Sequence, residues 1–162
     1  MKYEKMLPGN PKPGEYKLTN ISPYKIHQRC AEKFRVGRFL LAADAAHLCN
    51  PFGGLGLTGG LVDAGGLADC LIGLSEGIAD DSILDKYDEI RRAMWHNIIN
   101  VVSSANIRRL NDQDPDKALE NDEFLKGLVE AEKNPLLMKN TVNVRLDIQH
   151  DFTQYYKSPR KN

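Results

Sequence analysis

Residues 40–60, LLAADAAHLCNPFGGLGLTGG, constrain the fold of this chain more than any other stretch. The run FLLAA (39–43) is short and wholly apolar, as expected of a strand that is buried on both faces. Asp44, Pro51 and a cluster of glycines follow it, after which apolar residues recur at helical spacing. The stretch therefore predicts a buried strand, a glycine-rich loop and a helix in close succession.

The segment GLGLTG (54–59) matches the G-x-G-x-x-G fingerprint of dinucleotide-binding folds. In those folds the glycines follow their strand almost at once, and an acidic residue about twenty positions further on ends a second strand. Here a longer segment that includes Pro51 separates the apolar run from Gly54, and Asp80 lies between two predicted helices. The segment is therefore not expected to bind a pyrophosphate, and its glycines must serve another requirement of the backbone.

The whole sequence divides into four regions. Residues 1–15 contain three prolines and two glycines and predict an irregular lead-in. Residues 16–37 are the second region, in which apolar and polar residues alternate from Tyr16 to Ala31, around Tyr24, Ile26 and Cys30, and so predict a strand. Residues 38–75 hold the glycine-rich motif and a helix that begins near Leu57, and residues 76–162 are expected to be mainly helical. The predicted fold class is α/β, with short strands before a helical region.

Further features set the limits and faces of the predicted helices. Gly65 and Gly66 lie inside the first helix, where each costs about 1 kcal/mol relative to alanine, so they indicate close packing against backbone or a ligand. A second helix is predicted for 82–110 and a third for 117–133, which ends at Asn134-Pro135. The expected apolar stripe of the second helix comprises Ile83, Leu84, Tyr87, Ile90, Met94, Ile98, Val101 and Val102. Its expected solvated residues are Glu89, Arg91, Arg92, Arg108 and Arg109.

The composition limits the classes of partner. The chain has 22 basic and 22 acidic residues, whereas proteins that bind nucleic acid or anionic membranes carry a basic face, so neither is expected as a partner. Cys30, Cys49 and Cys70 are far apart, and with no secretory signal they indicate free thiols in a reducing compartment such as the cytoplasm. The apolar region 39–74 contains three aspartates, so no membrane span is expected. No metal-ligand set stands out.

The motif around Asp44 resembles a known cofactor site. The order is a strand, then DAAH (44–47), Pro51, Gly53-Gly54-x-Gly56 and a helix carrying Asp63-Ala64. It is similar to the second FAD motif of class A flavin monooxygenases, the aromatic-ring hydroxylases related to para-hydroxybenzoate and phenol hydroxylases. That family's pattern is close to G-D-A-A-H-x-x-x-P-x-G-G-x-G-x-N. The resemblance runs from about Ile21 to Phe152 and looks most like fungal members that tailor specialised metabolites.

This resemblance implies a set of FAD-binding residues: Asp44, Pro51, Gly53, Gly54, Gly56, Leu57 and Thr58. Asp44 would accept hydrogen bonds from hydroxyls of the ribityl chain. The proline-glycine segment would run along the isoalloxazine ring, which backbone N–H groups can approach because side chains are absent. The positive end of the helix near Leu57 would stabilise the reduced, anionic ring. The alternative for Asp44, a turn or capping residue only, stays open.

Two positions depart from the family pattern, and no catalytic residue can be assigned. Ala43 replaces the glycine before the aspartate, which adds a methyl group where the backbone nears the cofactor. Thr58 replaces the asparagine that often follows the last loop glycine.

His47 belongs to the motif and is expected to make a structural hydrogen bond. Cys49, beside the loop, is interpreted as a packing residue.

The resemblance covers only the C-terminal third of such an enzyme. The strand–GxGxxG–helix unit that binds the pyrophosphate does not occur before Ile21. The chain is therefore expected to be the C-terminal portion of a glutathione-reductase-type FAD-binding fold: a fragment, a short product or a subunit that pairs with a separate N-terminal chain or with itself. The implied reaction is hydroxylation of an aromatic or polyketide-like substrate with NAD(P)H and O2. The alternative is a flavin-free interaction or assembly module that retains the fold.

Overall fold

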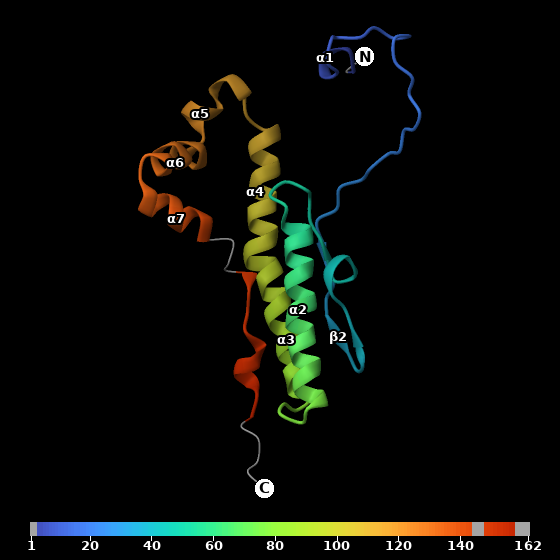
Figure 1. Cartoon of the computed structure of the whole chain (residues 1–162), viewed down its shortest axis with the longest axis vertical. Coiled ribbons are helices and arrows are strands. Elements are labelled where there is room, and N and C mark those ends of the chain that lie inside the picture. Colours follow the sequence, from blue (N-terminus) through green and yellow to red (C-terminus); the bar gives the residue numbers. More distant parts are fainter. Residues whose placement is uncertain (1–2, 144–147, 158–162) are drawn as a thin grey trace.

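The computed structural model describes residues 3–143 and 148–157. Two long helical segments lie side by side along the molecule, and short strands lie on one side of them (Figure 1). The first segment is α2 (Leu55–Ser75), and the second runs through α3 (Ser82–Met94), the π-helix η2 (Trp95–Ile99) and α4 (Asn100–Asn111). The described part of the chain is thus mainly helical with a few short strands.

The N-terminal part, which begins with α1 (Tyr3–Met6), extends away from the helices (Figure 1). It joins the body at β1 (Arg29–Cys30), which pairs antiparallel with β4 (His47–Leu48). The predicted strand around Tyr24 and Ile26 is therefore wrong except at its last residues. The side chains of Tyr24 and Ile26 are 82% and 45% exposed. β4 pairs with only two residues of the predicted strand, so the residues before Arg29 do not pack into the core at these positions.

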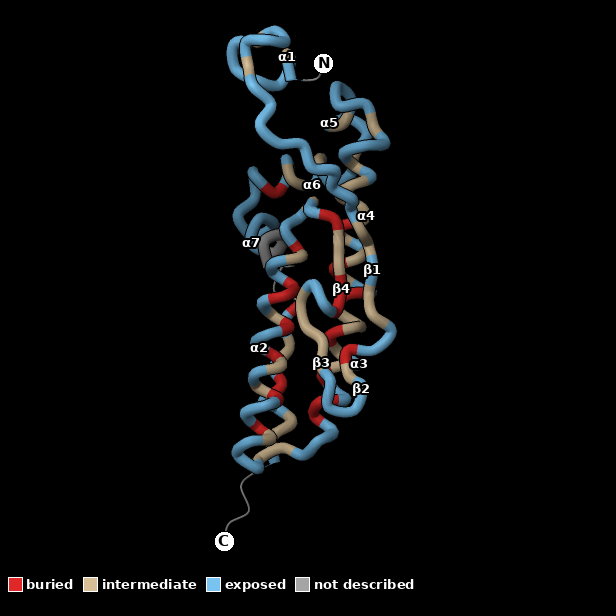
Figure 2. The backbone as a smooth tube through the Cα atoms, turned by 90° about the vertical axis from the view of Figure 1, so that its right-hand side faces the viewer, coloured by how far each residue is buried: buried red, intermediate tan, exposed pale blue. Residues whose placement is uncertain are grey.

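The apolar run 39–43 does not form a continuous buried strand: only its first two residues are paired, in a hairpin, and residues 40–43 are half-buried. β2 (Arg35–Val36) pairs antiparallel with β3 (Phe39–Leu40), and the chain then enters the 3-10 turn η1 (Ala43–Ala45). The prediction of a strand buried on both faces is wrong, because Phe39 is 81% exposed and regular pairing ends at Leu40. Figure 2 shows that burial is concentrated where this part of the chain meets the helices.

α2 packs closely against its neighbours on one side. It begins slightly before the predicted start at Leu57, so that most of the GLGLTG segment forms its first turns. A Cβ atom at Gly66 would lie 2.6 Å from the ring of Phe152, whereas one at Gly65 would meet open space. The prediction of close packing is thus confirmed at Gly66 and is wrong at Gly65.

The second helical segment contains a π-helical turn that the sequence did not predict. The predicted stripe is buried at Ile83, Leu84 and Tyr87, but Val101 is 54% exposed. From Tyr87 on, the buried residues are four apart and leave the predicted stripe: they are Arg91, Trp95, Ile99 and Ser103. A regular helix has about 3.6 residues per turn, so a four-residue spacing drifts around its axis unless a wider turn absorbs the difference. The π turn explains why the stripe shifts.

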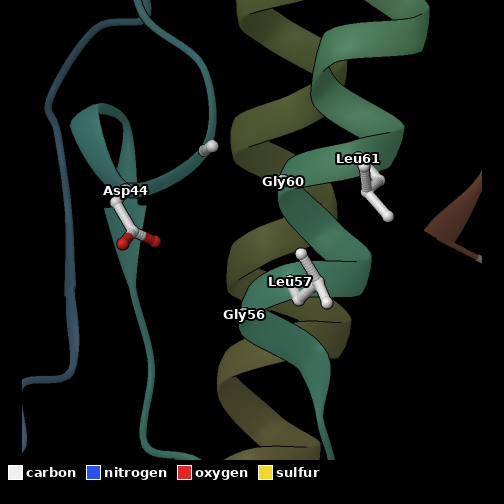
Figure 3. A pocket seen from close by; sticks show the side chains of 6 residues that line it. Asp44, Gly56, Leu57, Gly60 and Leu61 are labelled. Atoms are coloured by element: carbon white, nitrogen blue, oxygen red, sulfur yellow. The ribbon is translucent and has the colours of Figure 1, made fainter.

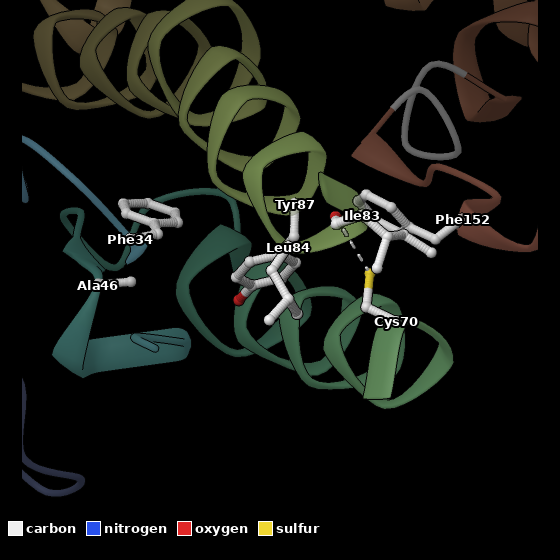
Figure 4. Packing of buried hydrophobic residues seen from close by; sticks show 7 residues of the cluster. All are labelled: Phe34, Ala46, Cys70, Ile83, Leu84, Tyr87 and Phe152. Atoms are coloured by element: carbon white, nitrogen blue, oxygen red, sulfur yellow. Dashed lines mark hydrogen bonds between the residues drawn. The ribbon is translucent and has the colours of Figure 1, made fainter. Parts of the chain in front are cut away.

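A core cluster holds α2 and α3 together beside the strands (Figure 4). It consists of Phe34, Ala46, Cys70, Ile83, Leu84, Tyr87 and Phe152. The Sγ atom of Cys70 lies 3.8 Å from the carbonyl oxygen of Ile83, and burial raises the pKa of this thiol to about 11. All three cysteines of the chain are unpaired, as predicted.

The helix predicted for 117–133 is divided. η3 (Pro115–Lys117) and α5 (Ala118–Asn121) precede Asp122, and α6 (Glu123–Glu132) follows it. The carboxylate of Asp122 accepts hydrogen bonds from the N–H groups of Phe124 and Leu125, so it caps a new helix and ends the old one. α7 (Pro135–Asn143) begins at the predicted break, and η5 (Phe152–Tyr155) lies against α2.

α2 has a second side that is apolar and exposed. The helix has 21 residues with a mean hydropathy of 1.3, which is long and apolar enough to cross a membrane by length and composition alone. A core helix meets the same criterion, and α2 carries the fully buried Asp63 among its packed glycines. Its largest exposed apolar side chains are Leu57, Leu61, Leu71 and Ile72.

Candidate functional site

The turn that carries Asp44 begins with a strained residue. Ala43 has a φ of 54°, in the left-handed region, which costs about 1–2 kcal/mol for a residue with a side chain. It also approaches α2 closely, because a Cβ atom at Gly60 would lie 2.8 Å from the Cβ atom of Ala43. The methyl group of Ala43 therefore fits only because position 60 is a glycine.

A buried ionic cluster lies behind this turn. Asp63, which is 0% exposed, accepts a hydrogen bond through Oδ2 from the N–H of Ala43 (3.0 Å), and the same oxygen lies 2.8 Å from Nε2 of His47. Its Oδ1 accepts from Nε of Arg91 (2.6 Å), and Nη1 of Arg91 donates to the carbonyl of Ile148 (2.5 Å). Burial acts to raise the pKa of Asp63, but the hydrogen bonds from His47 and Arg91 outweigh it and lower the pKa below its ordinary value.

This cluster corrects one prediction and agrees with another. Arg91 was predicted to lie on a solvated helix face, yet it is 1% exposed and paired with a carboxylate of a neighbouring helix. Helical periodicity groups residues by face but does not reveal what packs against that face, so this pairing was not predictable from α3 alone. His47 makes the structural hydrogen bond expected of it, to Asp63.

A neutral network holds the loop that precedes α2. Asn50 is 2% exposed; its Oδ1 accepts from the N–H of Phe52 (3.1 Å), and its Nδ2 donates to the carbonyl of Ser103 (2.9 Å). Gln28 accepts through Oε1 from both the backbone N–H (3.0 Å) and Nδ2 (3.1 Å) of Asn50. Nδ2 of Asn106 donates to the carbonyl of Phe52 (3.2 Å). The loop is therefore tied to Gln28, which immediately precedes β1, and to α4.

Two glycines end the loop with positive φ angles. They are 113° at Gly53 and 67° at Gly54, values that residues with side chains rarely adopt. The N–H of Gly54 donates to the carbonyl of Pro51 (3.2 Å), and Oγ1 of Thr58 donates to the carbonyl of Gly54 (2.8 Å). No side chain caps α2 at Gly54, and its first turn carries no acidic residue, so its positive end is not neutralised locally.

An open pocket of about 380 Å³ lies between the Asp44 turn and the first turns of α2. Figure 3 shows Asp44 across from the stretch of helix that carries Gly56, Leu57 and Gly60. The lining residues are Ala43, Asp44, Gly56, Leu57, Gly60 and Leu61. The pocket thus combines an exposed carboxylate, which accepts hydrogen bonds from hydroxyl groups, with bare helix backbone and apolar leucines.

The predicted site residues fall into two groups. Asp44, Gly56 and Leu57 line the pocket together, whereas the other predicted residues shape the loop and the start of α2 without lining it. Those others are Pro51, Gly53, Gly54 and Thr58. The roles of Asp63, Gln28 and Asn50 were not predicted. An aspartate among the glycines of an apolar helix is the signal that could have identified Asp63.

Cys49 lies beside the pocket. Its Sγ atom is 3.8 Å from the position that a Cβ atom would take at Gly56. Burial, with a smaller contribution from the charge of Asp44, raises the pKa of its thiol above the ordinary value. A raised pKa keeps the thiol protonated, which agrees with the interpretation of Cys49 as a packing residue.

The pocket lies within the part of the chain that identifies its family. Residues 9–102 match the family described as FAD binding domain. This match covers more than half of the chain and contains both the Asp44 turn and the pocket-lining part of α2. The chain therefore belongs to this FAD-binding family.

Similar proteins are monooxygenases by name. Para-nitrophenol 4-monooxygenase of Pseudomonas sp. (strain WBC-3) is 40% identical over 125 residues, which cover 77% of this chain and 31% of that protein. A 6-hydroxy-3-succinoylpyridine 3-monooxygenase of Pseudomonas putida (strain DSM 28022 / S16) is 38% identical over 113 residues, 70% of this chain and 28% of that protein. The crystal structure of p-nitrophenol 4-monooxygenase from Pseudomonas putida DLL-E4 matches with a TM-score of 0.71 and 36% identity, over 91% of this chain and 37% of that one. The chain thus spans about a third of the length of these relatives.

Proposed function

We propose that this chain supplies the ring and ribityl half of the FAD site of a flavin monooxygenase. The observation that carries the proposal is the pocket of Asp44, Gly56 and Leu57, which lies inside the region that matches the FAD-binding family. FAD, when bound, accepts the hydride from NAD(P)H and activates O2. The residues of the chain bind the cofactor, orient it and balance its charge.

The residues fit FAD in their chemistry. The exposed carboxylate of Asp44 is suited to accept hydrogen bonds from ribityl hydroxyls. Gly54 and Gly56 leave room for a flat ring beside the backbone. Gly53 instead lets the loop approach the side chain of Asn106, and Pro51 makes that loop rigid. The uncapped first turn of α2, which begins at Leu55 and includes Leu57 and Thr58, would bring a positive helix end to a ring that becomes anionic on reduction.

The substrate that we propose is an aromatic ring that already carries a hydroxyl group. A nitrophenol and a hydroxypyridine are the ring systems in the names of the two relatives described above. A larger polyketide-like ring system of the fungal specialised-metabolite type remains the other proposed class. No residue of this chain is assigned to proton transfer or to regiochemistry, so the catalytic role proposed for it is confined to holding the cofactor.

The exposed side of α2 is the surface that we propose for the pyrophosphate-binding unit. Leu57 is 77% exposed, Leu61 66% and Ile72 48%, and Phe39 on the neighbouring hairpin is 81% exposed. Apolar surface of this extent on a folded protein marks an interface. The proposed occupant is the N-terminal unit of a glutathione-reductase-type fold, which the relatives' additional length can supply; a second copy of this chain is the alternative.

The proposed division of the chain follows from this arrangement. Residues 16–37 would end the substrate-domain sheet, residues 38–75 would hold the FAD motif, and residues 76–162 would form the C-terminal helical region after the lead-in 1–15. The proposed location is the cytoplasm, where NAD(P)H and a reducing environment for the three free cysteines are both available.

The test of the FAD site is a comparison of three variants, with the N-terminal part of a relative supplied. Asp44→Ala should weaken FAD binding by about 1.5–3 kcal/mol, the scale for a lost hydrogen bond to a charged acceptor. Asp44→Asn should cost less, since an amide oxygen still accepts from a hydroxyl. His47→Ala should leave the affinity nearly unchanged, because Asp63 still holds Ala43. Titration by flavin fluorescence measures all three, and unchanged affinity in Asp44→Ala would reject the site.

A flavin-free interaction or assembly module is the second candidate function. The observation that favours it is the exposed apolar side of α2, which a binding module would use without any cofactor. The absorption spectrum of the purified protein, saturated with FAD and then passed through a desalting column, separates the two. Retained absorbance of bound flavin supports the monooxygenase site, and its absence at every FAD concentration supports the module.

A further inference from the structure

The turn 43–47 is fixed at both ends by one oxygen atom. Oδ2 of Asp63 receives the N–H of Ala43 at 3.0 Å, and Nε2 of His47 lies 2.8 Å from the same oxygen. Asp44 lies between these two ends, exposed, at the edge of the pocket. The bond to Ala43, the residue immediately before Asp44, limits where Asp44 points, and the contact with His47 anchors the far end of the turn.

Asp63 is itself held from the other side. Its Oδ1 accepts from Nε of Arg91 at 2.6 Å, and Arg91 is anchored through Nη1 to the carbonyl of Ile148. Asp63 and Arg91 are 0% and 1% exposed, so water does not compete for these bonds. Gly60, one helical turn before Asp63, allows the turn to approach α2 closely enough for the bond to Ala43 to form. The position of the turn is thus set by α2 and α3 together.

The geometry points to Asp63 as a positioning residue that acts through Asp44. It holds Ala43 in the left-handed conformation and so directs the carboxylate of Asp44 to the pocket, although Asp63 itself does not line the pocket. The inference rests on the proposed function only for the identity of the ligand, FAD. The contacts of Asp63 with Ala43 and His47 are made within the chain and do not depend on any ligand.

Amide hydrogen exchange of the chain without ligand tests this hold. Asp63→Asn should increase the exchange rate of the Ala43 amide about tenfold or more beyond any change at amides of α3, because the charged acceptor is lost. Asp69→Asn, the same change on the same helix, is the control and should leave Ala43 protected. Protection of Ala43 that survives in Asp63→Asn, or falls equally throughout the chain, would overturn the inference.

A second variant covers the case in which Asp63→Asn does not fold. His47→Ala leaves the pair of Asp63 and Arg91 intact and frees only the far end of the turn. It should speed exchange at residues 45–47 while the Ala43 amide stays protected. If the Ala43 amide lost as much protection as residues 45–47, the bond from Ala43 to Asp63 would not be independent of the contact between His47 and Asp63, and the inference would be contradicted.

A double-mutant cycle tests the action through Asp44. FAD titration by fluorescence should show that Asp63→Asn weakens binding about tenfold when Asp44 is present and less than about twofold in the Asp44→Ala background. Equal losses in the two backgrounds would mean that Asp63 does not act through Asp44. If Asp44→Ala alone leaves FAD affinity unchanged, the proposed function fails, while the exchange experiment still decides the hold on the turn.

Discussion

Two buried networks hold the two ends of the segment from Ala43 to Gly54, and they use different chemistry. At the first end, a charged pair of Asp63 and Arg91 binds the turn. At the second end, neutral amides centred on Asn50 bind the loop. Both networks fix backbone beside the pocket, but only the first leaves an uncompensated buried charge when one member is removed. The comparison predicts that the two ends differ in how strongly, and at which pH, they stabilise the fold.

The largest expected effect is that of Asp63→Ala. Removal of one partner of a buried ion pair costs about 3–5 kcal/mol, because the charge of Arg91 then stays buried without an opposite charge beside it. Asp69→Ala, on the same helix, should cost less than about 1 kcal/mol. Urea denaturation followed by circular dichroism measures both. A loss in Asp63→Ala no greater than that of the control would show that the charged cluster does not stabilise the fold.

The pH dependence of stability should separate the two networks next. Burial acts to raise the pKa of Asp63, but bonds from His47 and Arg91 lower it below the ordinary value. The contribution of Asp63 is therefore fully present above the unfolded pKa of about 4 and is lost as the pH falls through the lower folded pKa. Asp63→Asn should flatten this acid-side loss, whereas Asn50→Ala should leave its slope unchanged.

Urea midpoints measured across the acid range test this difference. Other carboxylates also contribute to the slope: bonds to Lys157 and Ser82 lower the pKa of Asp80 to about 2, and bonds to Thr153 lower that of Asp151. Because those groups are the same in every variant, the difference between parent and Asp63→Asn isolates Asp63. Parallel curves for the two proteins would contradict the assignment of this acid sensitivity to the charged cluster.

Asn50→Ala should have a smaller effect than Asp63→Ala. The side-chain amide of Asn50 bonds the N–H of Phe52, Oε1 of Gln28 and the carbonyl of Ser103, and a lost neutral network of this kind costs about 1–3 kcal/mol. Asn97→Ala, an exposed position on the same helical segment as Ser103, is the matched control and should change stability by less than about 0.5 kcal/mol. A cost equal to that of Asp63→Ala would remove the proposed difference between the two networks.

The sequence predicts the pocket better than it predicts what holds the pocket in place. The resemblance of the Asp44 motif to the family pattern identifies Asp44, Gly56 and Leu57, which the structure brings together at one pocket. The partnership of Asp63 with Arg91 depends on how α2 packs against α3, which local spacing does not encode.

The same limit applies to the elements. The helix boundaries near Ser82 and Pro135 follow from local turn residues and agree with the structure. The shift of the buried stripe, which exposes Val101 and buries Ser103, follows from the π turn, and no local residue signals it. The exposed Phe39 also shows that an apolar run predicts burial only where another element covers it.

The smallest expected effect is that of Ala43→Gly, which tests whether the charged cluster holds strain. A left-handed alanine costs about 1–2 kcal/mol, while a glycine loses about 0.5–1 kcal/mol more backbone entropy on folding. The substitution should therefore raise the free energy of unfolding by up to about 1.5 kcal/mol, with the bond from the position 43 amide to Asp63 unchanged. Ala45→Gly, in the same turn without a positive φ, should instead lower stability by about 0.5–1 kcal/mol. Thermal unfolding of the two variants compares them directly. If Ala43→Gly destabilises as much as Ala45→Gly does, Ala43 is not strained in solution, and the turn would not need the hold that Asp63 exerts on it.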